Sequence, residues 1–224
     1  MKPGTEKEFS YRFSVNEIFY SIQGESLYAG RPCVFVRLAG CNLRCTYCDT
    51  GYAYFEGRSM DIEEIVAAVK SYDFPLVEIT GGEPLMQAKT PALVQRLLDT
   101  GLEVIMETNG TLPIDRVAQQ CVKIVDIKCP GSGESGKTDF ENIGRLGKKD
   151  QVKFVICDRK DYEFARDIIK RYWIEGRKNP VLISPVSEMM DPAAAAAWIL
   201  EDRLDVRLHL QMHKILWPGI NKGV

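Results

Sequence analysis

The chain has 224 residues, of which 45% are hydrophobic, enough to build the core of one domain. Its 29 Lys and Arg against 31 Asp and Glu give a net charge of -2, so no basic field favours nucleic acid, and we expect none as a partner. It has no N-terminal apolar signal segment, no run of about 18 apolar residues and an odd number of cysteines, seven, so we expect a cytoplasmic protein without membrane association or a disulfide framework.

Short apolar runs rich in Val and Ile alternate with helical patterns along the chain. Seven runs are predicted strands: Cys33–Leu38, Leu76–Thr80, Glu103–Glu107, Val122–Lys128, Val152–Ile156, Val181–Ser184 and Val206–Gln211. The repeated strand-helix-strand order predicts an α/β fold with a mostly parallel sheet and right-handed crossovers. This order alone does not separate an open doubly wound sheet from a partial barrel.

Capping residues predict three helix starts between the strands. Asp61 with Glu64 makes a capping box, and Thr90 and Asp191 each stand as a cap directly before a proline. Gly101 is placed to end the second helix. These residues predict helix boundaries from local chemistry alone.

Three cysteines lie close together after the first predicted strand. Cys41, Cys45 and Cys48 stand in the segment GCNLRCTYCDT. Three thiolates can hold a four-iron cluster and leave one iron open for chemistry, whereas a ferredoxin cluster or a structural zinc takes four ligands. Cys33 is the near candidate for a fourth ligand, but we expect it to be a small buried strand residue. A zinc site completed from a distant part of the chain is the alternative.

Polar residues follow the predicted strands, where ligands bind in parallel α/β folds. The second strand leads into Gly81–Pro84 (GGEP), whose glycines allow backbone to approach a ligand, although a tight turn before a helix has the same pattern. Asp126 and Lys128 share one strand face, opposite Val125 and Ile127. An enclosed charged face needs a polar ligand or polar partners. Further polar residues of this series are Glu107 to Gly110, Lys153, and Ser184 with Pro185.

The C-terminal half adds one glycine-rich stretch and both histidines of the chain. Pro130 to Gly147 holds five of the 18 glycines and predicts a mobile loop over a site, or equally a solvated surface excursion. In the last predicted strand His209 and His213 share one face. We expect His209 to be solvated and His213 to be functional, and the apolar Ile215 to Pro218 predicts a tail that docks on the body, although a frayed tail also fits its composition.

The cysteine loop and the GGEP motif together resemble the radical S-adenosylmethionine (SAM) enzymes. The points of resemblance are the CxxxCxxC spacing, Tyr47 before the third cysteine, and Gly81–Pro84 further along the chain. The resemblance implies an incomplete (β/α) barrel, a 4Fe-4S cluster, and SAM whose amino and carboxylate groups occupy the open iron. It also implies that the GGEP segment contacts the SAM amino group.

A longer series of motifs resembles the 7-carboxy-7-deazaguanine synthases over nearly the whole chain. In order, these are Val15–Ser26, Gly30–Pro32, Phe35–Arg37, the cysteine loop with Asp49 and Thr50, Thr80–Pro84, Glu107–Gly110 and Gln211–Lys214. The resemblance implies conversion of 6-carboxy-5,6,7,8-tetrahydropterin to 7-carboxy-7-deazaguanine by radical ring contraction with loss of ammonia, on the route to deazapurines such as queuosine. It further implies a homodimer, Mg2+ as an additional cofactor, and a flavodoxin- or ferredoxin-type reductant.

The resemblance also assigns roles residue by residue. The cluster would be held by Cys41, Cys45 and Cys48, and Mg2+ by Thr50. SAM would be lined by Tyr47, Asp49, Gly82, Glu83, Asp126, Ile127, Lys128, Ser184, Pro185, Val186 and Ser187. The substrate would contact Ile22, Gln23, Gly24, Glu25, Arg37, Thr80 and His213. Arg37 suits a carboxylate through its planar fork, and Gln23 offers a donor and an acceptor to the pterin amide edge. No side chain is assigned as catalytic, because SAM and the cluster carry the radical chemistry.

Two rival functions stay open at this stage. A radical SAM activase, which acts on a glycine of a partner protein, shares both motifs, whereas the Gln23–Glu25 segment and Gln211–Lys214 favour a small pterin. A non-catalytic zinc or electron-transfer module would ignore SAM. We expect one domain over residues 1–224 with an N-terminal extension and a docking C-terminal tail, and we expect Cys121, Cys129 and Cys157 to be dispensable for the cluster.

Overall fold

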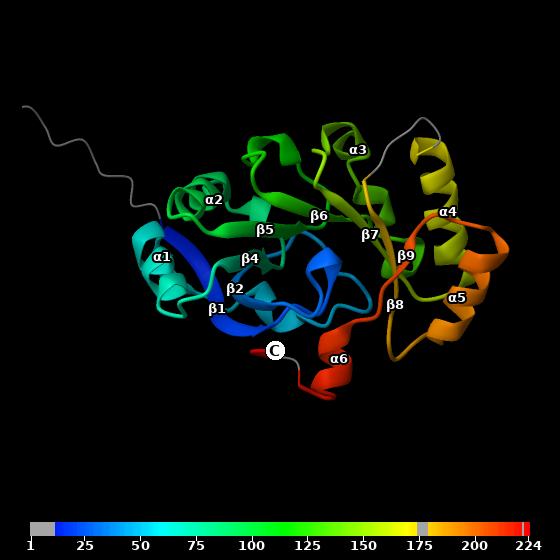
Figure 1. Ribbon diagram of the computed structural model, residues 1–224, viewed down its shortest axis with the longest axis horizontal. Coiled ribbons are helices and arrows are strands. Elements are labelled where there is room, and N and C mark those ends of the chain that lie inside the picture. The colour runs from blue at the N-terminus through cyan, green and yellow to red at the C-terminus, as the bar shows by residue number, and fades with distance from the viewer. Residues whose placement is uncertain (1–11, 174–178, 221) are drawn as a thin grey trace, which may run out of the picture.

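A curved sheet with helices along its outer side forms the body of the protein, as the computed structural model in Figure 1 shows. The structure describes residues 12–173, 179–220 and 222–224. Within them the strand order is β3-β1-β2-β4-β5-β6-β7-β8-β9. The strands are β1 Arg12–Ile22, β2 Pro32–Leu38, β3 Arg58–Asp61, β4 Leu76–Gly81, β5 Glu103–Thr108, β6 Val122–Asp126, β7 Gln151–Ile156, β8 Val181–Pro185 and β9 Arg207–Leu208.

The sheet is mostly parallel, as the strand-helix alternation predicts. Each pairing from β2 through β4 to β9 is parallel, while β1 pairs antiparallel with β2 and β3. The helices between and after the strands are α1 Ile62–Lys70, α2 Thr90–Asp99, α3 Glu141–Arg145, α4 Arg159–Trp173, α5 Pro192–Glu201 and α6 Met212–Leu216. Among the described helices none is long and apolar enough to cross a bilayer.

The predicted caps of α1 and α5 are confirmed, and the predicted cap of α2 is off by one residue. The Asp61 carboxylate accepts from the Glu64 N–H, and the Glu64 side chain accepts from the Asp61 N–H, which completes the capping box. Asp191 caps α5 by accepting from Ala193 N, and Gly101 adopts a φ of +83° just beyond α2. Thr90, however, is the first residue of α2 and not its cap, because its hydroxyl is turned to donate to the Pro84 carbonyl.

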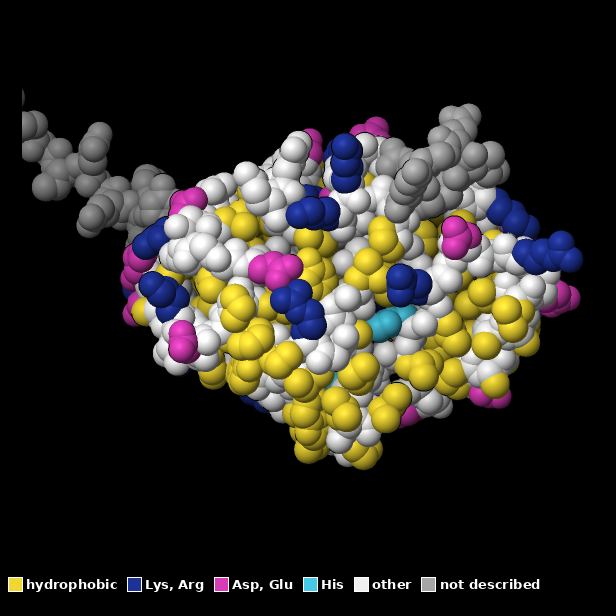
Figure 2. Space-filling view, in the orientation of Figure 1, with side chains coloured by type: hydrophobic (Ala, Val, Ile, Leu, Met, Phe, Trp, Pro, Cys, Tyr) yellow, Lys and Arg dark blue, Asp and Glu magenta, His cyan; other side chains and the backbone are white. Residues whose placement is uncertain are grey.

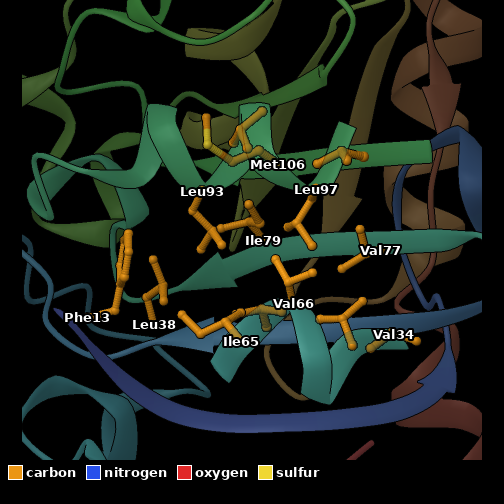
Figure 3. Close-up of a cluster of buried hydrophobic side chains, with 14 of the residues drawn as sticks. Phe13, Val34, Leu38, Ile65, Val66, Val77, Ile79, Leu93, Leu97 and Met106 are labelled. Carbon is orange, nitrogen blue, oxygen red and sulfur yellow. The ribbon is translucent and has the colours of Figure 1, made fainter. Parts of the chain in front are cut away.

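The outer face of the sheet is apolar and packs against the helices. Figure 3 shows Ile65 and Val66 of α1 and Leu93 and Leu97 of α2 lying against strand residues such as Ile79. A second buried cluster joins β6, β7 and β8 to α4 and α5; it includes Val152, Phe154, Ile156, Tyr162, Ala165, Ile183, Ala195 and Ile199. Burial of so many large side chains, at about 1.5 to 3 kcal/mol each, holds the helices in place.

The inner face changes from apolar to polar along each strand. Near the amino ends a third cluster closes the interior, formed by Phe19, Cys33, Phe35, Leu76, Ile105, Val122 and Ile124. Toward the carboxyl ends the inward positions become Glu78 and Thr80 on β4, Glu107 on β5 and Asp126 on β6. We call this third cluster the apolar plug. Because side chains alternate along a strand, Glu78, Glu107 and Asp126 each stand two places after the last residue that their strand gives to the plug.

Two predictions at the C-terminal end of the sheet are wrong. The last strand ends at Leu208, and Gln211 is already the residue before α6. His209 is not solvated, because only 9% of it is exposed, and its backbone N–H donates to the Ile183 carbonyl at 2.9 Å. Burial lowers the pKa of the His209 imidazole.

The glycine-rich stretch from residue 130 to 147 is not a loop over a site. It forms two short 3-10 helices, Pro130–Ser132 and Ser135–Lys137, and then α3. Asn142 is buried and donates to the backbone carbonyls of Gly110 and Leu112 at 3.0 and 2.9 Å. These side-chain hydrogen bonds to backbone carbonyls hold the stretch against the body. Amino-acid composition alone does not predict them.

Sequence reasoning also missed two strands, β1 and β3, whereas the N-terminal extension, residues 1–11, lies outside the described residues. In β1 the pairing with β2 shifts register between Val15 and Glu17, which interrupts the period-two pattern on which the prediction depends. The C-terminal tail contacts the body through Met212 N, which donates to the Gly24 carbonyl at 3.0 Å. Further along, the Lys222 ammonium lies 5.6 Å from the centre of the Tyr52 ring.

Candidate active site

The polar end of the inner face opens into a cavity of about 590 Å3. Strands β2, β4, β5, β6 and β7 each contribute inward residues to its wall near their carboxyl ends, and the C-terminal segment contributes Gln211, His213 and Lys214. This is the end of a parallel sheet where ligands bind. The cavity has room for a nucleotide-sized cofactor beside a small heterocycle.

Most of the predicted site residues line this one cavity. They are Ile22, Gln23, Gly24, Glu25, Arg37, Cys41, Cys45, Tyr47, Cys48, Asp49, Thr50, Thr80, Gly82, Asp126, Lys128, Val186, Ser187 and His213. The predicted SAM residues Glu83, Ile127, Ser184 and Pro185 do not line it. Ile127 instead packs in the outer apolar cluster, and Ser184 and Pro185 are buried in β8.

The three motif cysteines share the cavity wall. The Leu43 N–H points at Cys41 Sγ at 3.4 Å, and burial raises the pKa of the Cys45 thiol to about 11. The thiol of Cys48 is exposed at the surface. Thr46 anchors the loop, because its N–H donates to the Ser132 carbonyl at 3.1 Å.

The donor set fits a four-iron cluster. In the described part of the chain no three Cys, His, Asp or Glu side chains are placed to hold one metal ion, but a four-iron cluster binds each thiolate to a different iron, so its thiols stand apart. The other cysteines give no fourth ligand at this wall: Cys33, Cys121 and Cys129 are buried elsewhere, and Cys157 does not line the cavity.

The two glycines of GGEP bring β4 against the cysteine loop. A Cβ on Gly81, whose φ is +149°, would lie 2.1 Å from the Leu38 carbonyl oxygen, and one on Gly82 would lie 2.2 Å from the Gly40 carbonyl oxygen. Any side chain at either position would therefore push the motif away from the loop. Glycine is required here for packing as well as for access to a ligand.

Glu83 links the GGEP motif to the end of β5 through buried hydrogen bonds. It is fully buried, and its carboxylate accepts from Leu85 N at 2.9 Å, Thr108 Oγ1 at 2.8 Å and Asn109 N at 2.6 Å. Burial raises the pKa of Glu83 in spite of these donors. The side chain thus joins GGEP to the end of β5 and does not face the cavity.

A buried ion cluster forms the far wall of the cavity. The Lys153 ammonium contacts Glu25 Oε2 at 2.5 Å, Asp126 Oδ2 at 3.6 Å and the Glu107 carboxylate. Burial works to raise the pKa of Glu25, but Lys153, His213 and the Gln211 hydrogen bond together outweigh it and hold that pKa well below its usual range. Burial opposes the charge on Lys153 too, yet Glu107 and Glu25 raise its pKa well above the ordinary value. Glu25 and Lys153 therefore face each other as a charged pair.

Sequence reasoning left Lys153 and Glu107 without a role and overlooked Glu78, although all three line the cavity. The signal was present in the sequence: each is a charged residue inside an otherwise apolar strand. Such a residue, buried in a parallel sheet, must face a partner or a ligand. Only the register of the sheet shows that these three meet.

Asp126, one of the predicted SAM residues, has an unused acceptor in the cavity wall. Lys128 Nζ contacts Asp126 Oδ2 at 2.7 Å, while Asp126 Oδ1 is buried and has no hydrogen-bond partner. Burial would lower the pKa of Lys128, but Asp126 and Cys45 together outweigh it and raise that pKa. The Tyr47 hydroxyl donates to the Val155 carbonyl at 3.4 Å, which fixes the ring beside this pair.

Arg37 and Thr50 stand where the cavity extends under the C-terminal tail. Arg37 Nε donates to Glu17 Oε1 at 2.8 Å, which orients the guanidinium while Arg37 still lines the cavity. Thr50 Oγ1 lies 3.7 Å from Cys48 Sγ and shares a small side hollow with Arg37, His213 and Lys214. Asp49 lines the same hollow and pairs with Lys214 Nζ at 3.2 Å, so the remaining N–H groups of Arg37 are what suits an anionic ligand there.

Comparison with known proteins agrees with this geometry. The profile of the Radical SAM superfamily matches residues 36–183. The chain is 46% identical to the 7-carboxy-7-deazaguanine synthase of Koribacter versatilis, over 94% of this chain and 99% of that one. It is 44% identical to the enzyme of the same name from Chlorobaculum tepidum, over 94% of this chain and 97% of that one.

The fold has a solved counterpart as well. The crystal structure of QueE from Escherichia coli matches with a TM-score of 0.76 at 21% identity, covering 94% of this chain and all of that one. At that identity the match speaks for the fold alone. Together with the superfamily match it confirms the predicted partial (β/α) barrel.

Proposed function

The chain belongs to the 7-carboxy-7-deazaguanine synthases of the radical SAM superfamily, and from this premise we propose how its residues divide the work of the reaction. It is a radical SAM enzyme of deazapurine biosynthesis that uses a 4Fe-4S cluster and SAM. A protein-activating enzyme and a non-catalytic metal module are not favoured. The observation that carries the proposal is one cavity lined both by the three motif thiols and by the charged side chains of Glu25, Arg37 and Lys153.

Cys41, Cys45 and Cys48 would hold the cluster, and the residues around Asp126 would hold SAM. Bound there, the two cofactors supply hydrogen-abstracting radical chemistry. Asp126 Oδ1, buried and unpartnered, is placed to accept from a ligand hydroxyl or ammonium group. Tyr47 and Val186 provide wall area, so the protein's part is placement and exclusion of water.

Arg37, Gln23 and Glu25 would bind 6-carboxytetrahydropterin. Arg37 offers guanidinium N–H groups to the substrate carboxylate. Glu25 is held ionised by Lys153, so it can accept from N–H groups of the pterin ring. Gln211 Nε2 donates to Glu25 Oε1 at 2.9 Å and fixes the direction of that carboxylate. Ile22, Gly24, Thr80 and His213 complete this side of the cavity.

Thr50 would bind Mg2+ through its hydroxyl. Support comes from its place in a side hollow lined by Arg37 and Lys214, where a substrate carboxylate would supply oxygen ligands. One hydroxyl is a modest ligand, so substrate oxygens and water must fill most of an octahedral shell. Activity that falls on chelation and in Thr50→Val, with unchanged SAM binding, is the expected result; an unchanged rate in both would contradict the assignment.

We also infer a homodimer formed through the C-terminal face. Figure 2 shows hydrophobic side chains gathered around α6, and exposed Leu208, Leu210, Ile215, Leu216 and Ile220 belong to this segment. Apolar patches of this kind mark association surfaces. Light scattering should give twice the chain mass, and Ile215→Glu should shift it toward the monomer; an unchanged mass would place the interface elsewhere.

The reductant would be a flavodoxin- or ferredoxin-type protein that docks near Cys48. This thiol is exposed, so electrons need to cross little protein to reach a cluster there. All seven cysteines are free, which supports a reducing compartment such as the cytoplasm.

The test of the function is anaerobic turnover of the reconstituted protein with SAM, dithionite, Mg2+ and 6-carboxytetrahydropterin. We expect 7-carboxy-7-deazaguanine by mass spectrometry with little net loss of SAM. Cleavage of SAM to 5′-deoxyadenosine without the product would keep the radical chemistry and contradict the substrate. A protein that holds the cluster but never cleaves SAM would contradict the radical assignment.

A further inference from the structure

Glu78 is a buried acid in the cavity wall that the motifs leave without a role. It lies on the inner face of β4, two residues before Thr80, and both line the cavity. Only 4% of Glu78 is exposed. The inward position two residues earlier, Leu76, belongs to the apolar plug, so Glu78 is the first polar group on this strand.

Glu78 forms no ion pair with a described Lys or Arg, although the charges of Lys153 and Arg37 act on it from a distance. The Lys153 ammonium forms its ion pairs with Glu25, Glu107 and Asp126. Burial, and then the neighbouring charge of Glu107, raises the pKa of Glu78 to about 8. A buried acid without an ion-pair partner must be stabilised by another polar contact.

Its hydrogen-bond partner is the side chain of Gln23. Gln23 Nε2 donates to Glu78 Oε2, and at the other end of the same amide Gln23 Oε1 accepts from the Glu25 backbone N–H at 2.9 Å. An amide is a donor at one end and an acceptor at the other. A flipped Gln23 would set its oxygen against Glu78 and its NH2 against an N–H.

We propose that Glu78 is a positioning residue that acts through Gln23, fixing which end of the Gln23 amide meets the pterin and thereby setting affinity for this heterocycle. The inference rests on the proposed function, because it takes Gln23 as a substrate contact. Glu78 is the only side-chain acceptor that the described structure gives to Gln23 Nε2. Without it, the planar amide is held at one end alone, by the Glu25 N–H, and the whole amide plane can swing about that hydrogen bond.

The experiment compares Glu78→Leu, Glu78→Gln, Gln23→Ala and the double variant Gln23→Ala with Glu78→Leu, all as reconstituted holoenzyme. Glu78→Leu should raise KM for the pterin about fivefold to tenfold, the size of one orienting hydrogen bond, and change kcat by less than about twofold. Glu78→Gln should restore KM, because its amide oxygen still accepts from Gln23. Should the Leu variant not fold, Glu78→Val, which suits a strand, replaces it.

The double variant separates positioning from a general structural role. If Glu78 acts through Gln23, adding Glu78→Leu to Gln23→Ala should leave KM where Gln23→Ala alone put it. Titration of the fluorescent analogue 6-carboxypterin should show the same non-additivity in Kd. SAM cleavage without pterin should be unchanged in every variant.

Additive effects on KM, or a Glu78→Leu variant with wild-type KM, would overturn the inference. A parallel fall in pterin-independent SAM cleavage would also overturn it, because the damage would then extend beyond Gln23. Failure of the proposed function looks different: the wild-type enzyme itself would form no deazaguanine acid. The wild-type control thus distinguishes the two failures.

Discussion

Replacing Lys153 by Met tests the buried ion cluster directly. The side chain of Lys153 is 4% exposed, and its ammonium is shared by Glu25, Glu107 and Asp126. Met keeps most of the apolar stem and removes the charge, so the carboxylates stay buried without their counter-ion. Removing one partner of a buried ion pair lowers the free energy of unfolding by about 3 to 5 kcal/mol. A chain of this size loses roughly 2 to 4 °C of Tm per kcal/mol. The expected loss near neutral pH is therefore about 6 to 20 °C.

The sign of the pH dependence follows from Glu25. Its pKa lies below the unfolded value of 4.5, because Lys153, with His213 and Gln211, outweighs burial. Its ion pair therefore stabilises the fold above that pH and loses this effect as the pH falls through the lower folded pKa. The high pKa of Lys153 keeps the ammonium charged over this whole range. In the variant the carboxylates can take up protons instead. The gap in Tm between wild type and Lys153→Met should thus be widest near neutral pH and narrow toward about pH 4.5.

Lys123→Met is the matched control. Lys123 is also buried and ion-paired, with Nζ 3.2 Å from Asp150 Oδ2, but it does not line the cavity. Anaerobic thermal melting of both holoenzymes, followed by pterin kinetics at a temperature where both are folded, separates stability from binding. Both variants should melt earlier, and only Lys153→Met should raise KM for the pterin. A Tm within about 2 °C of wild type for Lys153→Met at neutral pH, or equal KM for both variants, would refute the reasoning.

Three further outcomes follow from the site. Cys45→Ala should lose the cluster absorbance and all turnover, while Cys157→Ala should keep both; loss of iron in the second variant would refute the ligand assignment. Arg37→Ala should raise KM for the pterin by about tenfold to a hundredfold and spare SAM cleavage, and a normal pterin affinity would remove its role. Gly24→Ala should weaken pterin binding, because the new Cβ would lie 2.3 Å from His213 Nδ1 and must displace the ring; an unchanged KM would show that His213 is not needed at its present position.

Local chemistry carried much of the fold prediction. The Val- and Ile-rich runs predicted seven strands, β2 and β4 to β9, within a few residues, because buried parallel strands are continuous apolar segments. The strand that failed most, β1, has a register shift inside it, and the predicted strand end at Gln211 failed because the chain turns into α6 there. Both depend on pairing with distant segments, which no local window contains.

The site residues can be separated in the same way, into those predicted from local sequence and those placed by the tertiary structure. The sequence by itself predicted the cysteine loop, the glycines of GGEP and the caps Asp61 and Asp191, since each depends on spacing between neighbours in the chain. Only the tertiary structure decided that Lys153, Glu107, Glu78 and Gln23 share one wall, that Glu83 turns away from the cavity, and that His209 is buried. Their meeting is set by sheet register and by the docking of the C-terminal segment, and desolvation then gives each buried charge a pKa that depends on its neighbours in space and not on its neighbours in sequence.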